Sequence, residues 1–353
     1  MAKPPLTAKA PSMLGRRTVR ILLGAAPVAA GVVLLNALAW FHAWRMLHFG
    51  GTRERTKPPE RLTWYERAHV LVAGIDLPKP RNDQFPEGLT WPCATHRVPT
   101  TDHMELEAWW TAHPRPRGVV VLFHGYAATK SSMAGEARAF HALGFSTLLV
   151  DHRGHGGSSG HWTSIGYHEV ADVAAAADYV RNHLCMLSPL VLYGQSMGAV
   201  SIFRAVSTAA VGEPAAVIVE GLYDEMLNAI RNRFDAMGVP SFPFAELLGF
   251  WGGVQMGFTA RRHNPAAYAR AIRTPVLMLH GSEDPRATCA QGRRVFEKLR
   301  GPKTFVEFRG LKHESLYTAS PDEWVRAVDA FLETVVGPPG ADARTPFAGG
   351  TRQ

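Results

Sequence analysis

The chain has 353 residues, of which 46% are hydrophobic, and a formal net charge of +8. This length suits one large domain with additional segments. Residues 1–20 carry five basic and no acidic side chains, and residues 45–67 carry six basic and three acidic ones, so these two segments hold the whole excess charge. The neutral remainder argues against nucleic-acid binding, and the two basic segments favour contact with anionic lipid.

The first structural element expected is a membrane-spanning helix. Residues 21–41 contain no charged side chain, and at 1.5 Å per residue they span roughly 30 Å, the thickness of the hydrocarbon core. Trp40 and Trp44 suit the lipid–water interface at the far end. We predict a basic tail over 1–20 and one transmembrane helix over 21–44, which makes this a single-pass protein of a bacterial-type inner membrane.

Two alternatives for this segment stay open. Ala37-Leu38-Ala39 resembles a signal-peptidase site, and cleavage there releases a soluble exported protein. Arg16-Arg17 is a weak match to a twin-arginine export signal. Basic residues flank both ends of the apolar stretch, so its orientation stays open. Residues 45–94 are expected to form a juxtamembrane linker.

Residues 95–336 alternate strand-like and helix-like patterns. Expected strands are 105–110, 118–123, 146–151, 190–193, 215–220, 276–279 and 304–308; expected helices include 166–184, 197–206, 291–299 and 322–336. The inner strands are continuous apolar runs, which is typical of strands covered on both faces. We predict an α/β domain with a mostly parallel central sheet and helices on both faces. Residues 337–353, rich in Pro, Gly and Ala, are expected to be a flexible tail.

A Gly-Gln-Ser-Met-Gly sequence stands at 194–198, between the apolar run 189–193 and the helix-forming stretch 199–206. A strand, a tight turn carrying serine and a helix form the context of a nucleophile elbow. Glycine is needed on both sides because the turn leaves no room for other side chains. We therefore predict that Ser196 is a catalytic nucleophile.

An acyl-transfer site also needs backbone N–H groups that face the developing oxyanion from two directions. One is expected from Met197, directly after the serine. The other is expected from Tyr126, because His124-Gly125-Tyr126 follows the strand-like run 118–123. Met197 and Tyr126 are thus the predicted oxyanion hole.

Residues 222–273 separate two expected strands and are too numerous for a plain helical crossover. We predict a small helical cap over the site. The cap is rich in large apolar side chains, and about half of them are expected only to pack it onto the body. The others favour an apolar acyl pocket, with Phe242, Phe244 and Trp251 as the predicted substrate-binding residues.

Asp284 lies in a turn after the apolar run 275–279, and His313 lies in a loop after the strand-like run 304–308. The chain order is therefore serine, acid, histidine. In this arrangement Ser196 attacks once His313 takes its proton, and His313 later protonates the leaving group. Asp284 holds the imidazole in the required tautomer.

Other residues compete for these roles. The chain has 16 histidines, and His124 and His280 are expected to shape loops. Glu283 and Glu220 are alternative acids. Asp284 is favoured because it lies a full turn beyond its strand, where it can point back to the histidine.

Residues 151–158 (Asp-His-Arg-Gly-His-Gly-Gly-Ser) resemble the D-x-R-G-x-G-x-S loop of α/β-hydrolases near the serine aminopeptidase and monoacylglycerol lipase groups. The motifs at 124–125, 194–198, 281–284 and 313 agree with this resemblance, which covers 95–336. It implies the α/β-hydrolase fold and its catalytic machinery, but one fold hosts many activities. No acidic pair stands out in the cap to hold a substrate amino terminus, which argues against peptidase activity.

The sequence thus predicts a membrane-anchored serine hydrolase that cleaves carboxylic esters of lipid-like or acyl-chain type through an acyl-enzyme. A thioesterase or peptidase with the same triad is the first alternative, and a catalytically silent binding module is the second. No cofactor or metal is expected. The spacing of Cys93, Cys185 and Cys289 fits no metal site, and tight-turn glycines account for the Asp and His residues at 151–161.

Overall fold

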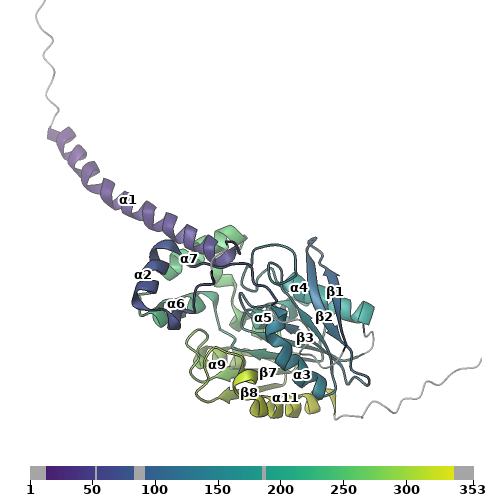
Figure 1. The fold of residues 1–353 in the computed structure, drawn as a ribbon. Coiled ribbons are helices and arrows are strands. Elements are labelled where there is room, and N and C mark those ends of the chain that lie inside the picture. The colour runs from purple at the N-terminus through teal and green to yellow at the C-terminus, as the bar shows by residue number, and fades with distance from the viewer. Residues whose placement is uncertain (1–12, 52–53, 83–91, 185–187, 338–353) are drawn as a thin grey trace, which may run out of the picture.

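The computed structural model describes residues 13–51, 54–82, 92–184 and 188–337, and its centre is an eight-stranded sheet (Figure 1). In chain order the strands are β1 (Cys93–Pro99), β2 (Glu105–Thr111), β3 (Val119–Phe123), β4 (Ser146–Val150), β5 (Leu190–Gln195), β6 (Ala216–Glu220), β7 (Val276–Gly281) and β8 (Lys303–Phe308). Their order in the sheet is β1-β2-β4-β3-β5-β6-β7-β8. The two pairs that involve β2 are antiparallel and the other pairs are parallel. The predicted mostly parallel sheet is confirmed.

Helices cover both faces of this sheet. They are α1 (Met13–Leu47), α2 (Trp64–Ala73), α3 (Ala134–Ala142), α4 (Val170–Tyr179), α5 (Met197–Ser207), α6 (Met226–Met237), α7 (Phe244–Met256), α8 (Pro265–Tyr268), α9 (Cys289–Lys298), α10 (Leu316–Ala319) and α11 (Pro321–Val336). Side chains of α4, α5 and α9 belong to the hydrophobic core on one face. Side chains of α3 and α11 belong to the core on the other face.

The alternation of side chains along β3 explains why its sequence is apolar throughout. Val119, Val121 and Phe123 contribute to the first core, whereas Val120 and Leu122 contribute to the second. All five side chains are fully buried. A central strand covered on both faces therefore has no position that water can reach.

The edge strand β1 is a difference from the sequence prediction, which began the domain at residue 95 without a strand there. Most of its side chains are exposed or half-buried, and only Val98 is buried. A strand that is paired along one edge and has so few buried positions shows no apolar periodicity, so its sequence does not predict it. Only its antiparallel pairing with β2 defines it.

The segment between β6 and β7 folds into the expected helical cap, which contains α6, α7 and α8. The end of α1 packs against α7, where Ala43 and Leu47 are buried next to Gly252. The indole N–H of Trp251 donates to Asn36 Oδ1 at 3.1 Å, so polar contacts also join the two helices. The long helix is thus docked on the cap at its C-terminal end and projects away from the body at its other end (Figure 1).

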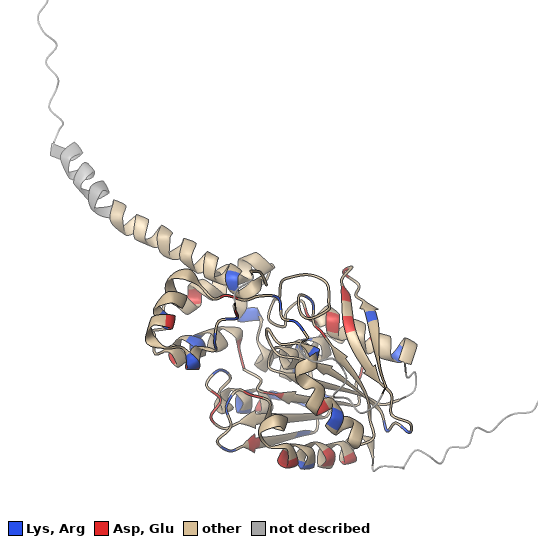
Figure 2. Cartoon of the chain, in the orientation of Figure 1, with Lys and Arg blue, Asp and Glu red and all other residues tan. Residues whose placement is uncertain are grey.

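The projecting part of α1 is apolar and exposed. Residues 26–47 are long and apolar enough to cross a membrane, and 11% of the most apolar window is buried in the protein. Val28, Val33 and Leu34 each expose more than half of their surface. Residues 26–44 of this helix carry no charged side chain, and Arg45 follows at its base; the coloured part of the helix in Figure 2 is accordingly tan up to that point. Such a surface suits a lipid environment.

The segment predicted as a juxtamembrane linker packs against the body. Phe49 and Leu77 are buried together, and Gly50 N donates to Leu77 O at 2.9 Å. The amide of Phe49 also donates to His161 O. Leu62 and the α2 residue Val70 join the main core. Of the other predicted segments, residues 1–12, 83–91 and 338–353 lie outside the described residues.

Candidate active site

The turn between β5 and α5 holds Ser196 in a strained conformation. Its φ is 49° and its ψ is −108°, a region that L-residues rarely adopt. The Ser196 amide donates to the Glu220 carbonyl at 2.8 Å, which ties the turn to β6. A Cβ on Gly194 would lie 2.6 Å from the Gly198 backbone, and one on Gly198 would lie 2.2 Å from Phe123 O. Glycine is therefore required at both positions, and the serine hydroxyl is left free to face the loops beyond the sheet.

His313 connects the hydroxyl of Ser196 with the carboxylate of Asp284. Its Nε2 lies 3.1 Å from Ser196 Oγ and its Nδ1 lies 2.6 Å from Asp284 Oδ2. The three residues follow β5, β7 and β8, whose carboxyl ends lie at the same edge of the parallel sheet. The structure thus brings together three residues that the sequence separates by up to 117 positions.

The second oxygen of Asp284 is held by backbone amides. Arg286 N and Ala287 N donate to Oδ1 at 2.8 and 2.9 Å. Burial alone raises the pKa of a carboxyl, but the hydrogen bond and charge of His313 together with these amides hold the pKa of Asp284 below its usual value. The carboxylate is therefore ionised at neutral pH, where it can orient the imidazole and stabilise its protonated form.

The competing residues have other partners. Glu283 is exposed, and Glu220 accepts hydrogen bonds from Tyr193 Oη at 2.7 Å and from the indole of Trp324. His124 Nε2 accepts from the amide of His152, and His280 Nε2 lies 2.6 Å from Ala287 O. Both histidines are buried, and burial lowers the pKa of each. They hold loops, as the sequence predicted.

Of the two predicted oxyanion donors, one directly follows the serine in the chain and the other lies in a loop that passes beside it. Met197 is the first residue of α5, where a helix leaves its N–H groups without intrahelical acceptors. Tyr126 stands in the loop after β3, which neighbours β5 in the sheet. A Cβ on Gly125 would be 3.5 Å from Ser196 Cβ, so this loop passes directly beside the serine.

A cavity of about 180 Å³ opens at Ser196 and His313, and both basic and acidic residues line it. Arg55, Arg233 and Arg286 contribute to its wall from three different segments of the chain. The sequence pointed to neither Arg55 nor Arg286, because neither belongs to a motif or to a periodic pattern.

The segment after α1 forms part of this site. The hydroxyl of Tyr126 donates to Met46 O at 2.5 Å, and Arg55 Nη1 donates to Ala127 O at 2.6 Å. Burial raises the pKa of Tyr126 to about 12, so its hydroxyl remains a donor. Arg286, two residues after Asp284, forms an ion pair with Glu60. The end of α1 and the residues after it thus support two loops: the one after β3 that carries Tyr126, and the one after β7 that carries Asp284.

The structure corrects the predicted substrate-binding residues in the cap. Phe242, Phe244 and Trp251 do not contribute to the cavity at Ser196. Phe242 is 75% exposed, Phe244 is 39% exposed, and Trp251 packs toward α1 through Asn36. Phe244 stacks on Phe234 of α6, so only Trp251 of the three is held by α1.

No group of three His, Cys, Asp or Glu side chains is placed to hold a metal ion within the described parts of the chain. Asp151, the first residue of the Gly-rich loop, forms an ion pair with the buried Lys130 and accepts the amide of Gly157 at 2.9 Å. The carboxylate of Asp151 therefore stabilises the conformation of this loop.

Comparison with known proteins gives a consistent result. A family model described as serine aminopeptidase, S33, matches residues 114–221. Monoacylglycerol lipase of Mycolicibacterium smegmatis is 36% identical over 238 residues, which cover 58% of this chain and 84% of the lipase. The protein YqkD of Bacillus subtilis, itself uncharacterized, is 26% identical over 241 residues, which cover 67% of this chain and 78% of that protein.

A similar fold is found among solved structures. An esterase of Pyrococcus furiosus superposes with a TM-score of 0.63 and 22% sequence identity over 74% of this chain and 97% of the esterase. At this identity the likeness concerns the fold.

Proposed function

Since this chain belongs to the α/β-hydrolase superfamily, in the group of serine aminopeptidase-like and monoacylglycerol lipase-like proteins, we propose that it is a membrane-anchored serine esterase acting on acyl-chain or lipid-like esters. The observation that carries the proposal is His313, which lies within hydrogen-bond reach of Ser196 Oγ on one side and of Asp284 on the other. This is the arrangement that activates a serine nucleophile.

In the proposed reaction, His313 Nε2 takes the hydroxyl proton as Ser196 Oγ attacks the ester carbonyl carbon. The oxyanion that forms accepts hydrogen bonds from the amides of Tyr126 and Met197. Collapse breaks the bond between the acyl carbon and the leaving oxygen, and His313 protonates the leaving alcohol. Water then attacks the acyl-enzyme with the same base, releasing the carboxylic acid and restoring the hydroxyl of Ser196.

Labelling with a fluorophosphonate probe tests the nucleophile. We expect the purified protein to be labelled and Ser196→Ala to lose the label completely. Ser207→Ala, at the end of α5, should be labelled like the wild type, because its hydroxyl only contacts Arg204 O. Persistent labelling of Ser196→Ala would mean that another residue is the nucleophile.

A second assay tests the bond that is cleaved. p-Nitrophenyl esters, acyl thioesters and aminoacyl amides of matched acyl length should be hydrolysed with the esters as preferred substrates. A preference for amides or thioesters would replace the esterase assignment with a peptidase or thioesterase. No turnover and no labelling in folded protein would favour a binding module.

The anchor is proposed to be retained in the mature protein. The indole of Trp251 donates to Asn36, so cleavage after Ala39 would remove this contact between α1 and the cap. We expect the mature protein to retain residues 1–39 and the membrane-bound protein to resist carbonate extraction. A mature chain that begins near residue 40 would contradict this proposal.

A further inference from the structure

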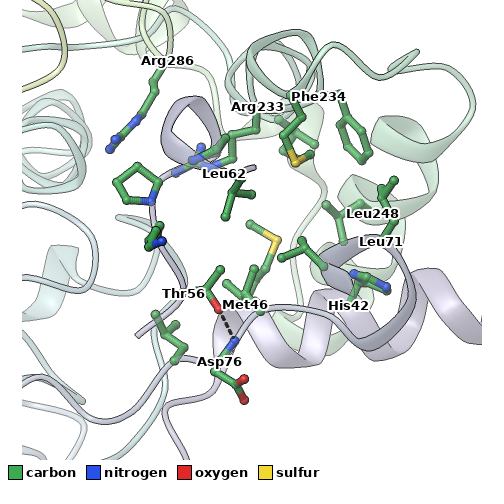
Figure 3. Close-up of a pocket in the computed structure, with 18 of the residues that line it drawn as sticks. His42, Met46, Thr56, Leu62, Leu71, Asp76, Arg233, Phe234, Leu248 and Arg286 are labelled. Carbon is green, nitrogen blue, oxygen red and sulfur yellow. Dashed lines mark hydrogen bonds between the residues drawn. The ribbon is translucent and has the colours of Figure 1, made fainter. Parts of the chain in front are cut away.

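A second cavity adjoins the one at Ser196, and its walls are mostly apolar. It has a volume of about 140 Å³ and lies between the base of α1, the segment 55–77 and the cap helices. Figure 3 shows Leu71, Leu248 and Phe234 at one end of this cavity and Arg233 and Arg286 at the other. The cavity therefore has an apolar end and a basic end.

The basic end is shared with the catalytic cavity. Arg55, Tyr126, Arg233 and Arg286 line both. A molecule whose ester lies at Ser196 can thus extend past these residues into the apolar end. Met46 of α1 also lines this cavity, so it opens beside the base of the proposed membrane helix.

Two of the three guanidinium groups have no carboxylate partner among the described residues. Arg286 is paired with Glu60, but Arg55 donates only to the Ala127 carbonyl, and Arg233 lies 5.9 Å from the ring centre of Tyr126. Burial, which disfavours the charged form, lowers the pKa of both Arg55 and Arg233. Two half-buried cations without a paired carboxylate favour an anion supplied from outside.

We propose that the substrate is a single-chain lipid ester with a phosphate on its head group, a proposal that rests on the esterase function above. The phosphate is bound by Arg55 and Arg233, because guanidinium groups match the oxygens of phosphate with paired N–H donors. The acyl chain occupies the apolar cavity between the base of α1, α2 and α6. A phosphate lies only a few bonds from a glycerol ester, which agrees with the position of both arginines beside Ser196.

Matched substrates test the head group. The full-length protein in detergent micelles is assayed with 1-oleoylglycerol 3-phosphate and with 1-oleoylglycerol, which differ only in the phosphate. We expect kcat/KM to be about ten- to hundredfold higher for the phosphorylated ester, the range of a charge-assisted hydrogen bond. An equal or higher value for 1-oleoylglycerol would overturn the proposal while leaving the esterase function intact.

Arginine variants locate the binding site. Arg233→Gln and Arg55→Gln should each reduce the preference for the phosphorylated ester about tenfold, whereas Arg270→Gln, at an exposed position, should keep it. If all three variants retained the wild-type preference, the phosphate would be bound elsewhere and the proposal would be wrong.

Chain length tests the apolar cavity and separates a lipid from a soluble phosphate ester. Leu71→Trp narrows the cavity and should shift the preferred acyl length of glycerol 3-phosphate esters toward shorter chains. Its neighbour Val72 is 75% exposed, so Val72→Trp should keep the wild-type profile. A wild-type preference for acetyl over oleoyl esters, or identical profiles for the two variants, would refute the lipid assignment. Absence of both turnover and fluorophosphonate labelling would instead refute the esterase function.

Discussion

Replacement of Glu220 by Gln should remove a pH-dependent loss of stability. Glu220 is the last residue of β6 and is buried next to the turn that carries Ser196, with its Oε1 bonded to Tyr193 and Trp324. Burial and the nearby charge of Glu136 raise the pKa of Glu220 from 4.5 to about 7. Glutamine keeps an acceptor oxygen for both donors but carries no charge.

The sign and size of the effect follow from this pKa. The folded protein binds the Glu220 proton more tightly than the unfolded chain, so this contribution to stability is complete below pH 4.5 and is lost as the pH rises through 7. A shift of that size corresponds to about 3 kcal/mol in the free energy of unfolding. For a domain of this size, we expect the melting temperatures of Glu220→Gln and the wild type to differ by roughly 6–12 °C above pH 7.

Thermal unfolding of the detergent-solubilised protein between pH 4.5 and 8.5 measures the effect. The melting temperature of Glu220→Gln should rise relative to the wild type as the pH increases, with the steepest change near pH 7. Glu283→Gln, at an exposed position, should follow the wild type throughout. If Glu220→Gln and the wild type gave parallel curves, Glu220 would not be held protonated by its surroundings and the reasoning would fail.

Three further substitutions have defined outcomes. Asp284→Asn should lower kcat for ester hydrolysis by about 10⁴-fold with little change in melting temperature, because the imidazole loses its orienting partner; a loss below tenfold would exclude Asp284 as the acid. Gly198→Ala places a Cβ 2.2 Å from Phe123 O and should destabilise the fold by more than about 3 kcal/mol in a melting assay. Gly50→Ala should be tolerated in the same assay, because a Cβ at Gly50 meets nothing within 4 Å. Leu47→Ala should cost about 2–5 kcal/mol in detergent, while Leu34→Ala, at a position 71% exposed, should cost little; equal losses would mean that α1 is not docked on the body.

Local pattern was sufficient to predict the sheet and the meeting of Ser196, Asp284 and His313. The inner strands are apolar at every position because both faces are covered, and that requirement is visible in the sequence. The turn at Gly194–Gly198 is also visible in the sequence, because its backbone leaves no room for a side chain at either glycine. Because parallel strands end at one edge, residues just beyond three such strands are brought together by the topology itself.

Contacts between distant segments could not be predicted in this way. Neither the bond from Tyr126 to Met46 nor the ion pair between Arg286 and Glu60 has a periodic or turn signature, because each joins side chains that only the finished packing brings together. For the same reason, composition alone suggested that Trp251 faces the substrate, whereas its indole N–H donates to Asn36 of α1. The sequence by itself determined the sheet and the order of the candidate catalytic residues, since these depend on local periodicity and turn geometry. Only the tertiary structure decided that the base of α1 supports the loop of Tyr126 and that Arg55, which follows α1, lines the site, because that choice depends on which surfaces bury each other.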